Sequence, residues 1–161
     1  MRKVEAAILA VTAVTAAQLL GSVPSPTPKH PGTMFWYARL RKPSYMPAVP
    51  AFAIVWTALD SLLGFTGYRL LRMPGSSART AALGFWAATV GCVAGFSWVL
   101  FGRKTLGGAT MVAGGTLAAA TGTAMAASRE DRVAAVAGLP LIGWCAFATM
   151  LQADVWRRNS T

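Results

Sequence analysis

One carboxylate lies inside an apolar stretch of the chain. Asp60 follows Trp56 by four residues within the hydrophobic run 51–71, so the two side chains share one face of the predicted helix. An ionised carboxylate inside a membrane costs at least about 2.5 kcal/mol unless it is paired, hydrated or protonated. Asp60 is therefore either a protonated or hydrogen-bonded group inside the protein, or a cavity-lining contact for a ligand or a proton.

Aromatic and cationic side chains gather in the stretch that leads into this run. The segment 36–56, WYARLRKPSYMPAVPAFAIVW, places Arg39, Arg41 and Lys42 beside a tryptophan and a tyrosine. Most of the nine prolines lie in the connection 24–50, and proline prevents one continuous helix there. The other connections are short, so only this one is free to fold over the rest of the molecule. We expect it to form a lid, with about one helical turn at the membrane interface.

Patterns typical of catalytic or metal sites are not apparent in the sequence. His30, the single histidine, lies in the Pro-rich connection and is predicted to be solvated. Cys92 and Cys145 lie in apolar runs without a second ligand at a metal-binding spacing, so we interpret them as small buried hydrophobes. No Ser-His-Asp set, pair of carboxylates or phosphate-binding loop is present. These residues favour ligand binding over acid-base or metal chemistry.

The apolar runs that carry these residues are long enough to cross a membrane. Hydrophobic residues make up 55% of the 161 residues and charged residues 12%, and the mean hydropathy is +0.49. We predict an all-α integral membrane protein, a single domain over residues 1–161, with spans at 4–23, 51–71, 78–101, 106–127 and 133–156. Each run has the roughly 20 residues that a helix needs to cross a bilayer. A signal peptide is the alternative for the first run, which is longer than a usual signal core.

The formal net charge of +10 would indicate a nucleic-acid partner in a soluble protein. Here the cations lie between apolar runs, where anionic lipid headgroups and acidic ligands are the natural partners. We therefore expect the lipid bilayer and a small molecule as partners, and no nucleic acid.

Small residues recur at four-residue spacing in two of the runs. One row is Ala87, Gly91 and Gly95; the other is Gly114, Ala118, Gly122 and Ala126. Such rows let helix backbones approach closely, either within one chain or across a homodimer.

Two segments resemble motifs of the TspO/MBR family of tryptophan-rich sensory and translocator proteins. The pattern W-Y-x-x-L-x-K-P-x-x-x-P-P-x-x-x-F-x-x-V-W-x-x-L-Y-x-x-M-G is matched at Trp36, Tyr37, Leu40, Lys42, Pro43, Pro47, Phe52, Val55, Trp56, Leu59 and Gly64. The pattern P-Y-L-x-W-x-x-F-A-T-x-L-N-x-x-V-W-x-x-N is matched at Pro140, Trp144, Phe147, Ala148, Thr149, Leu151, Val155, Trp156 and Asn159. The resemblance covers essentially the whole chain.

The resemblance implies a five-transmembrane-helix bundle, often a homodimer, that binds porphyrins and related tetrapyrroles in a pocket beneath the first loop. Family positions that contact ligand correspond to Trp98, Trp144, Ala148 and Leu151. The other expected ligand-binding residues are Tyr37, Pro47, Phe52, Trp56, Asp60 and Gly95. The expected ligand is a porphyrin or haem, with no covalent cofactor and no metal site.

The chain departs from the family pattern at polar positions. Gly95 replaces a common Asn, Asp60 replaces a usual Tyr, and Gln152 replaces an Asn. Ala48 stands for the second proline of the first motif. These departures leave the ligand preference open.

The implied function is that of a membrane sensor, regulator or transporter of porphyrins or other hydrophobic ligands. The alternative is an enzyme that degrades bound porphyrin with light or an oxidant, with Trp98 and Trp144 as electron partners. A pore is disfavoured, because Asp60 and Gln152 are too few polar groups to mark a path. We expect a bacterial cell membrane as the location, since no cleavable presequence is obvious.

Overall fold

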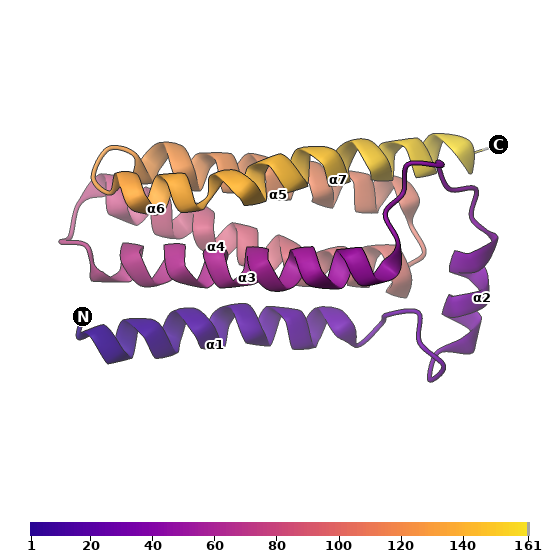
Figure 1. Cartoon of the computed structure of the whole chain (residues 1–161), viewed down its shortest axis with the longest axis horizontal. Helices are drawn as coiled ribbons and strands as arrows, with labels where there is room; N and C mark the ends of the chain where they lie inside the picture. Colours follow the sequence, from indigo (N-terminus) through magenta and orange to yellow (C-terminus); the bar gives the residue numbers. More distant parts are fainter. Residues whose placement is uncertain (161) are drawn as a thin grey trace.

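Helices form all the regular structure in the described part of the chain. The computed structural model describes residues 1–160, and no β-strand occurs within them. Figure 1 shows long helices packed side by side, with one short helix across an end. The elements are α1 (Lys3–Ser22), α2 (Pro31–Arg39), α3 (Val49–Arg72), α4 (Ser77–Ser97), the π-helical turn η1 (Trp98–Gly102), α5 (Leu106–Ala127), α6 (Arg132–Ala137) and α7 (Leu139–Arg158).

Four helical segments have the length and composition of membrane spans. They are Lys3–Ser22, Val49–Arg72, Ser77–Gly102 and Arg132–Arg158, and their bounds lie close to those predicted. The all-helical class and several apolar helices are thus confirmed. The helix α5 coincides with the predicted run 106–127, but it is rich in Ala, Gly and Thr and is not among the four.

The small residues of α5 pack against neighbouring helices of the same chain. The helix contacts α4 on one side and α7 on the other. A Cβ atom added to Gly122 would lie 2.8 Å from the Phe85 ring, and one added to Gly114 would lie 3.9 Å from Thr149. In α4, by contrast, a Cβ added to Gly91 or Gly95 would meet nothing within 4 Å. Gly114, Gly122 and Ala126 of the α5 row therefore pack within the chain, whereas Ala118 is exposed. Gly91 and Gly95 of the α4 row are left open.

The last predicted span is interrupted near its start. Helix α6 ends at Ala137, and α7 begins at Leu139 with Pro140 in its first turn. Proline lacks the N–H that would continue the hydrogen-bond ladder, which accounts for the break. Asp131 caps α6, because its carboxylate accepts hydrogen bonds from the Val133 and Ala134 amides, both at 3.0 Å.

The Pro-rich connection folds across the end of the bundle. Within the lid, residues 24–50, the helical part is longer than the single turn predicted: α2 has nine residues and begins at Pro31. Figure 1 shows α2 across the ends of the long helices, at the end where α7 also finishes. The last two residues of the lid, Val49 and Pro50, already belong to α3.

Hydrogen bonds tie the lid to the end of α7. The Arg41 amide donates to Asn159 Oδ1 at 2.9 Å, and Asn159 Nδ2 donates to the Arg41 carbonyl oxygen at 3.0 Å. The Tyr45 hydroxyl donates to Asp154 Oδ2 at 3.1 Å. The Asn159 side chain thus pairs with both the N–H and the carbonyl group of Arg41. These bonds hold the lid over the bundle.

Candidate functional site

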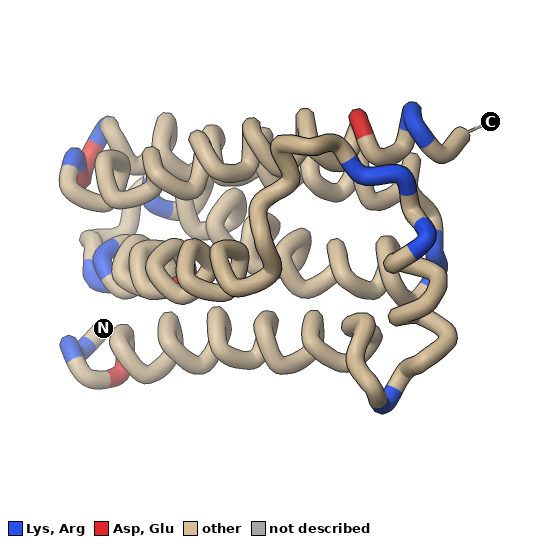
Figure 2. Tube along the Cα trace, turned by 45° about the vertical axis from the view of Figure 1, so that its right-hand side comes forward, with Lys and Arg blue, Asp and Glu red and all other residues tan. Residues whose placement is uncertain are grey.

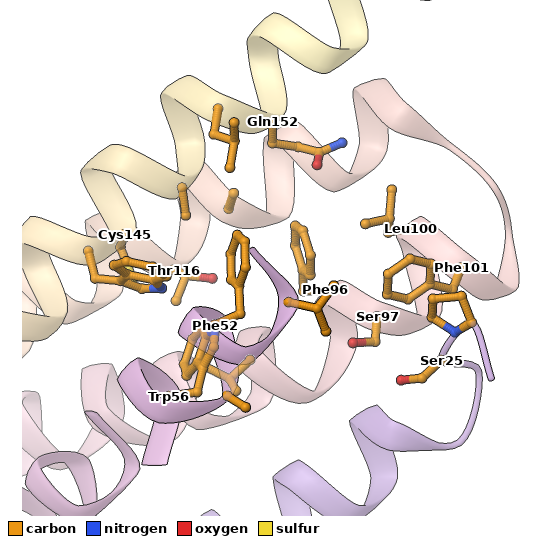
Figure 3. A pocket seen from close by; sticks show the side chains of 18 of the residues that line it. Ser25, Phe52, Trp56, Phe96, Ser97, Leu100, Phe101, Thr116, Cys145 and Gln152 are labelled. Atoms are coloured by element: carbon orange, nitrogen blue, oxygen red, sulfur yellow. The ribbon is translucent and has the colours of Figure 1, made fainter. Parts of the chain in front are cut away.

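A cavity of about 460 Å³ lies beneath the lid. Its volume is typical of sites for small organic ligands, which measure roughly 300–1,000 Å³. The wall includes residues from the lid and from α1, α3, α4, η1, α5 and α7. Figure 3 shows side chains from these elements converging on one space. The aromatic residues of the wall are Tyr37, Phe52, Trp56, Phe96, Phe101 and Trp144.

Six of the expected ligand-binding residues line this cavity. They are Tyr37, Phe52, Trp56, Trp144, Ala148 and Leu151. They come from the lid, from α3 and from α7, so the structure brings together segments from both matched motifs.

The other four expected residues are not part of the cavity lining: Pro47, Asp60, Gly95 and Trp98. Trp98 is 47% exposed, and its indole N–H donates to the Leu20 carbonyl oxygen at 2.9 Å. Its neighbours Phe96 and Ser97 line the cavity instead. Asp60 on α3 is half-buried and accepts a hydrogen bond from Gln18 on α1.

The aromatic side chains pack edge to face along the wall. The Phe52 and Trp144 ring centroids lie 5.5 Å apart with the rings at 76°, and those of Tyr37 and Phe101 lie 5.3 Å apart at 80°. Edge-to-face contact is a favoured arrangement of aromatic rings, so these pairs stabilise the wall. An aromatic wall is suited to a flat aromatic ligand.

The indole nitrogen of Trp144 carries an unused hydrogen-bond donor. Trp144 Nε1 is buried and has no partner among residues 1–160. Buried indole N–H groups nearly always find an acceptor, because leaving one unpaired costs about 1–3 kcal/mol. Trp144 lines the cavity, so a ligand that carries an acceptor can supply the missing partner.

Cations gather at the lid end of the cavity. Lys42 Nζ lies 4.0 Å from the centroid of the Tyr37 ring, and Lys104 Nζ lies 5.9 Å from that of Trp36. Burial lowers the pKa of Lys42 and raises the pKa of the Tyr37 hydroxyl. Figure 2 shows other Lys and Arg residues at this end of the bundle. The positive charge at this end of the bundle favours a ligand with acidic groups.

Our sequence reasoning did not single out several lining residues. Gln18, Phe96, Phe101 and Thr116 belong to the cavity wall. A signal existed for Gln18, because it is the one amide in the apolar run 4–23 and polar residues in spans usually face the protein interior. The phenylalanines carried no such signal, since an apolar residue suits a lipid-facing position equally well.

Comparison with known proteins agrees with this arrangement. The model of the TspO/MBR family matches residues 8–157. The translocator protein of Sus scrofa is 33% identical over 130 residues, which cover 78% of this chain and 76% of that protein. The tryptophan-rich sensory protein of Cereibacter sphaeroides is 30% identical over 124 residues, 77% of each chain. The translocator protein of Homo sapiens is 30% identical over 126 residues, 77% of this chain and 75% of that protein.

The family match covers nearly the whole bundle, from within α1 to the end of α7. It includes the lid and every helix that contributes to the cavity wall. The apolar helices agree with a multi-pass membrane protein. The chain belongs to the TspO/MBR family.

Proposed function

We propose that this protein binds a porphyrin or a related tetrapyrrole in the cavity beneath the lid, and so senses, regulates or moves such ligands. The unpartnered Trp144 N–H carries the proposal, because a buried donor in a cavity wall calls for an acceptor from outside the chain. A tetrapyrrole has a flat apolar ring that suits the aromatic walls. Its carboxylates suit the cations at the lid.

We also propose that α5 is the fifth membrane span. It has 22 residues, enough to cross a bilayer, and it packs between α4 and α7. Because neighbouring helices cover much of its surface, α5 needs less apolar surface toward the lipid than the other spans do. Cysteine accessibility at the two ends of α5 tests this: labelling from opposite sides of the membrane is expected, and labelling from one side would contradict it. The bacterial cell membrane stays a prediction, which fractionation of the host cell would test.

The ligand proposal is tested by a matched pair of tryptophan variants. Trp144→Phe keeps an aromatic ring in the cavity but removes the N–H, and Trp98→Phe makes the same change outside the cavity. Protoporphyrin titrated into the purified protein is followed by tryptophan quenching and by its Soret band. The loss of one hydrogen bond should raise the Kd of Trp144→Phe about three- to tenfold, while Trp98→Phe stays close to wild type.

Two outcomes contradict this proposal. Absence of saturable binding to the wild-type protein would remove the ligand class. Equal affinities in the two variants would show that the Trp144 N–H does not meet the ligand. Illumination of the same complexes tests the degradation alternative, because a product that forms only when Trp144 is present would indicate an enzyme.

Self-association is a separate proposal that rests on the open row of α4. Gly91 and Gly95 have free space beside them, which a second copy of the chain can enter. We expect Gly91→Leu to shift a dimer to monomer in detergent, measured by light scattering. Gly143→Leu, at an equally open glycine on α7, is the control for a general effect of bulk. A wild-type monomer would contradict the proposal.

A further inference from the structure

We propose that Gln18 selects ligands with a neutral hydrogen-bond donor at the end remote from their acidic groups, and that Asp60 positions the Gln18 amide. The inference rests on the proposed function, because it names the ligand chemistry that the same cavity favours. Gln18 Nε2 donates to Asp60 Oδ1 at 2.8 Å, which joins α1 to α3. Gln18 lines the cavity, whereas Asp60 does not.

The Gln18 amide has hydrogen-bonding capacity left over. A primary amide carries two N–H donors and one carbonyl acceptor, and Asp60 takes one donor. Within residues 1–160, no hydrogen bond is made to the side-chain carbonyl oxygen of Gln18, Oε1. The accepting oxygen of Asp60 requires the amide nitrogen to face it, so the carbonyl oxygen points away from that carboxyl group. A ligand hydroxyl or N–H that reaches Gln18 meets an acceptor whose orientation is already set.

The two regions of the cavity wall differ in charge. Lys42 lies over the Tyr37 ring in the lid, whereas Gln18 is hydrogen-bonded to Asp60 on α3. A ligand carboxylate near Gln18 would bring two acids together, which is unfavourable unless one of them binds a proton. The carboxylates of an amphiphilic ligand therefore belong at the lid, and its neutral end belongs at Gln18. Ligands with a hydroxyl group at that end are favoured over ligands with a hydrocarbon group there.

A matched pair of probes isolates this contact. Protoporphyrin and haematoporphyrin share one ring and both propionates, but two vinyl groups of the first are hydroxyethyl groups in the second. The measured quantity is the ratio of the two Kd values, obtained by tryptophan quenching on the same preparation. Damage to the protein affects both ligands alike, so it cancels from the ratio. Gln18→Met keeps the length of the side chain and removes its amide, and it should reduce the relative preference for haematoporphyrin about three- to tenfold.

Thr149→Val is the control, because it removes a polar group from the bundle outside the cavity lining. The Thr149 hydroxyl donates to the Cys145 carbonyl oxygen of its own helix at 2.7 Å. We expect this change to leave the ratio at its wild-type value. Asp60→Asn is the second test variant: it keeps the shape of Asp60 but lets the Gln18 amide turn over. It should shift the ratio in the same direction as Gln18→Met, by less, and it carries the test if Gln18→Met does not fold.

The outcomes separate the two proposals. Failure of the wild-type protein to bind either porphyrin would overturn the proposed function and this inference with it. Binding of both porphyrins with one ratio in wild type, Gln18→Met and Asp60→Asn would overturn the inference alone. An equal shift in Thr149→Val would overturn it as well, because the preference would then not belong to Gln18.

Discussion

Two tryptophans distinguish the packed half of the bundle from the hollow half. Trp86 on α4 is 7% exposed, and its indole N–H donates to the Leu63 carbonyl oxygen at 2.9 Å. Trp144 on α7 also has a buried indole nitrogen, yet that nitrogen has no partner among residues 1–160. The fold completes the hydrogen bonding of the first side chain, and we propose that a ligand completes that of the second.

Several polar groups of the packed half find partners within the chain, whereas the buried Thr66 hydroxyl has none among residues 1–160. Arg69 on α3 forms two hydrogen bonds with Asp131, at 2.7 and 3.0 Å, and Asp131 also caps α6. Arg79 donates to the Leu70 and Leu71 carbonyl oxygens, which lie at the end of α3 where intrahelical donors run out. Gly67 allows the Trp86 ring to lie against the α3 backbone, because a Cβ there would overlap the ring. None of these residues lines the cavity beneath the lid.

The largest effect is expected from Trp86→Ala. Removal of a buried tryptophan leaves an unfilled space and removes the hydrogen bond to the Leu63 carbonyl oxygen, which should destabilise the protein by about 3–5 kcal/mol. Thermal unfolding in detergent, followed by circular dichroism, measures the loss. Trp144→Ala is the matched comparison, and it should cost less because its ring borders an existing cavity. Equal losses for the two variants would contradict the division into a packed and a hollow half.

The next effect is expected from filling the cavity. Ala148→Phe places a ring in the space that a ligand would occupy, so porphyrin affinity should fall at least about tenfold with little loss of stability. Ala146→Phe is the control, because Ala146 is exposed on the same helix and does not line the cavity. Titration and thermal unfolding of both variants give the two quantities. Unchanged affinity in Ala148→Phe would show that the ligand binds elsewhere.

A smaller effect is expected from Asp131→Asn in the packed half. The amide keeps an oxygen that can cap α6 but loses the charge that pairs with Arg69. We expect a loss of about 1 kcal/mol at pH 7, since solvent partly screens the 35% exposed Arg69 side chain. Chemical unfolding at pH 7 measures the difference. Porphyrin affinity should stay at the wild-type value, and a change in it would show that the two halves are coupled.

The same ion pair makes a specific contribution to acid sensitivity. Burial alone would raise the pKa of Asp131, but hydrogen bonds from Arg69, Ala134 and Val133 outweigh it, so the pKa is lowered in the folded protein. Its stabilisation is therefore fully present above the unfolded value of about 3.9 and is lost as the pH falls through the lowered folded value. In Asp131→Asn this part of the pH dependence should be missing. A wild-type acid profile in the variant would contradict the assignment.

The smallest effect is expected from Asn159→Ala at the lid. The change removes both hydrogen bonds to Arg41, which lie at the surface and so contribute little to stability. We expect the ligand to dissociate a few times faster, measured by stopped-flow fluorescence, with the unfolding temperature nearly unchanged. Ser160→Ala is the control, because that hydroxyl group bonds only to the carbonyl oxygen of its own helix. An equal rate in both variants would show that Asn159 does not hold the lid.

Much of the fold was predictable because membrane helices have a strong sequence signal. The apolar runs place the spans within a few residues of the observed helices. The break at Gly138 was not predicted, although Pro140 was visible, since a proline in a span can bend a helix as well as end it. The length of α2, nine residues, was also missed. In the structure this helix makes a tertiary contact through the Tyr37 and Phe101 rings, which a local pattern does not reveal.

The candidate site was predictable only in part. The motif matches pointed to Trp144, Ala148 and Leu151, all in the cavity wall. Trp98 was expected beside them, but it lies outside, where the Leu20 carbonyl oxygen accepts its N–H. Helical periodicity cannot decide between such cases, because α4 is apolar or small around most of its circumference. The π-helical turn at Trp98 further alters the spacing along this helix.

The sequence by itself determined the class of protein, the positions of the helices and the need of Asp60 for a polar partner. These follow from local properties: apolar length, proline content and the cost of a carboxylate in a membrane. Only the tertiary structure decided that Gln18 is that partner, that Trp86 is satisfied and that Trp144 is not. These facts depend on which helix faces which, and side chains far apart in the sequence settle that together.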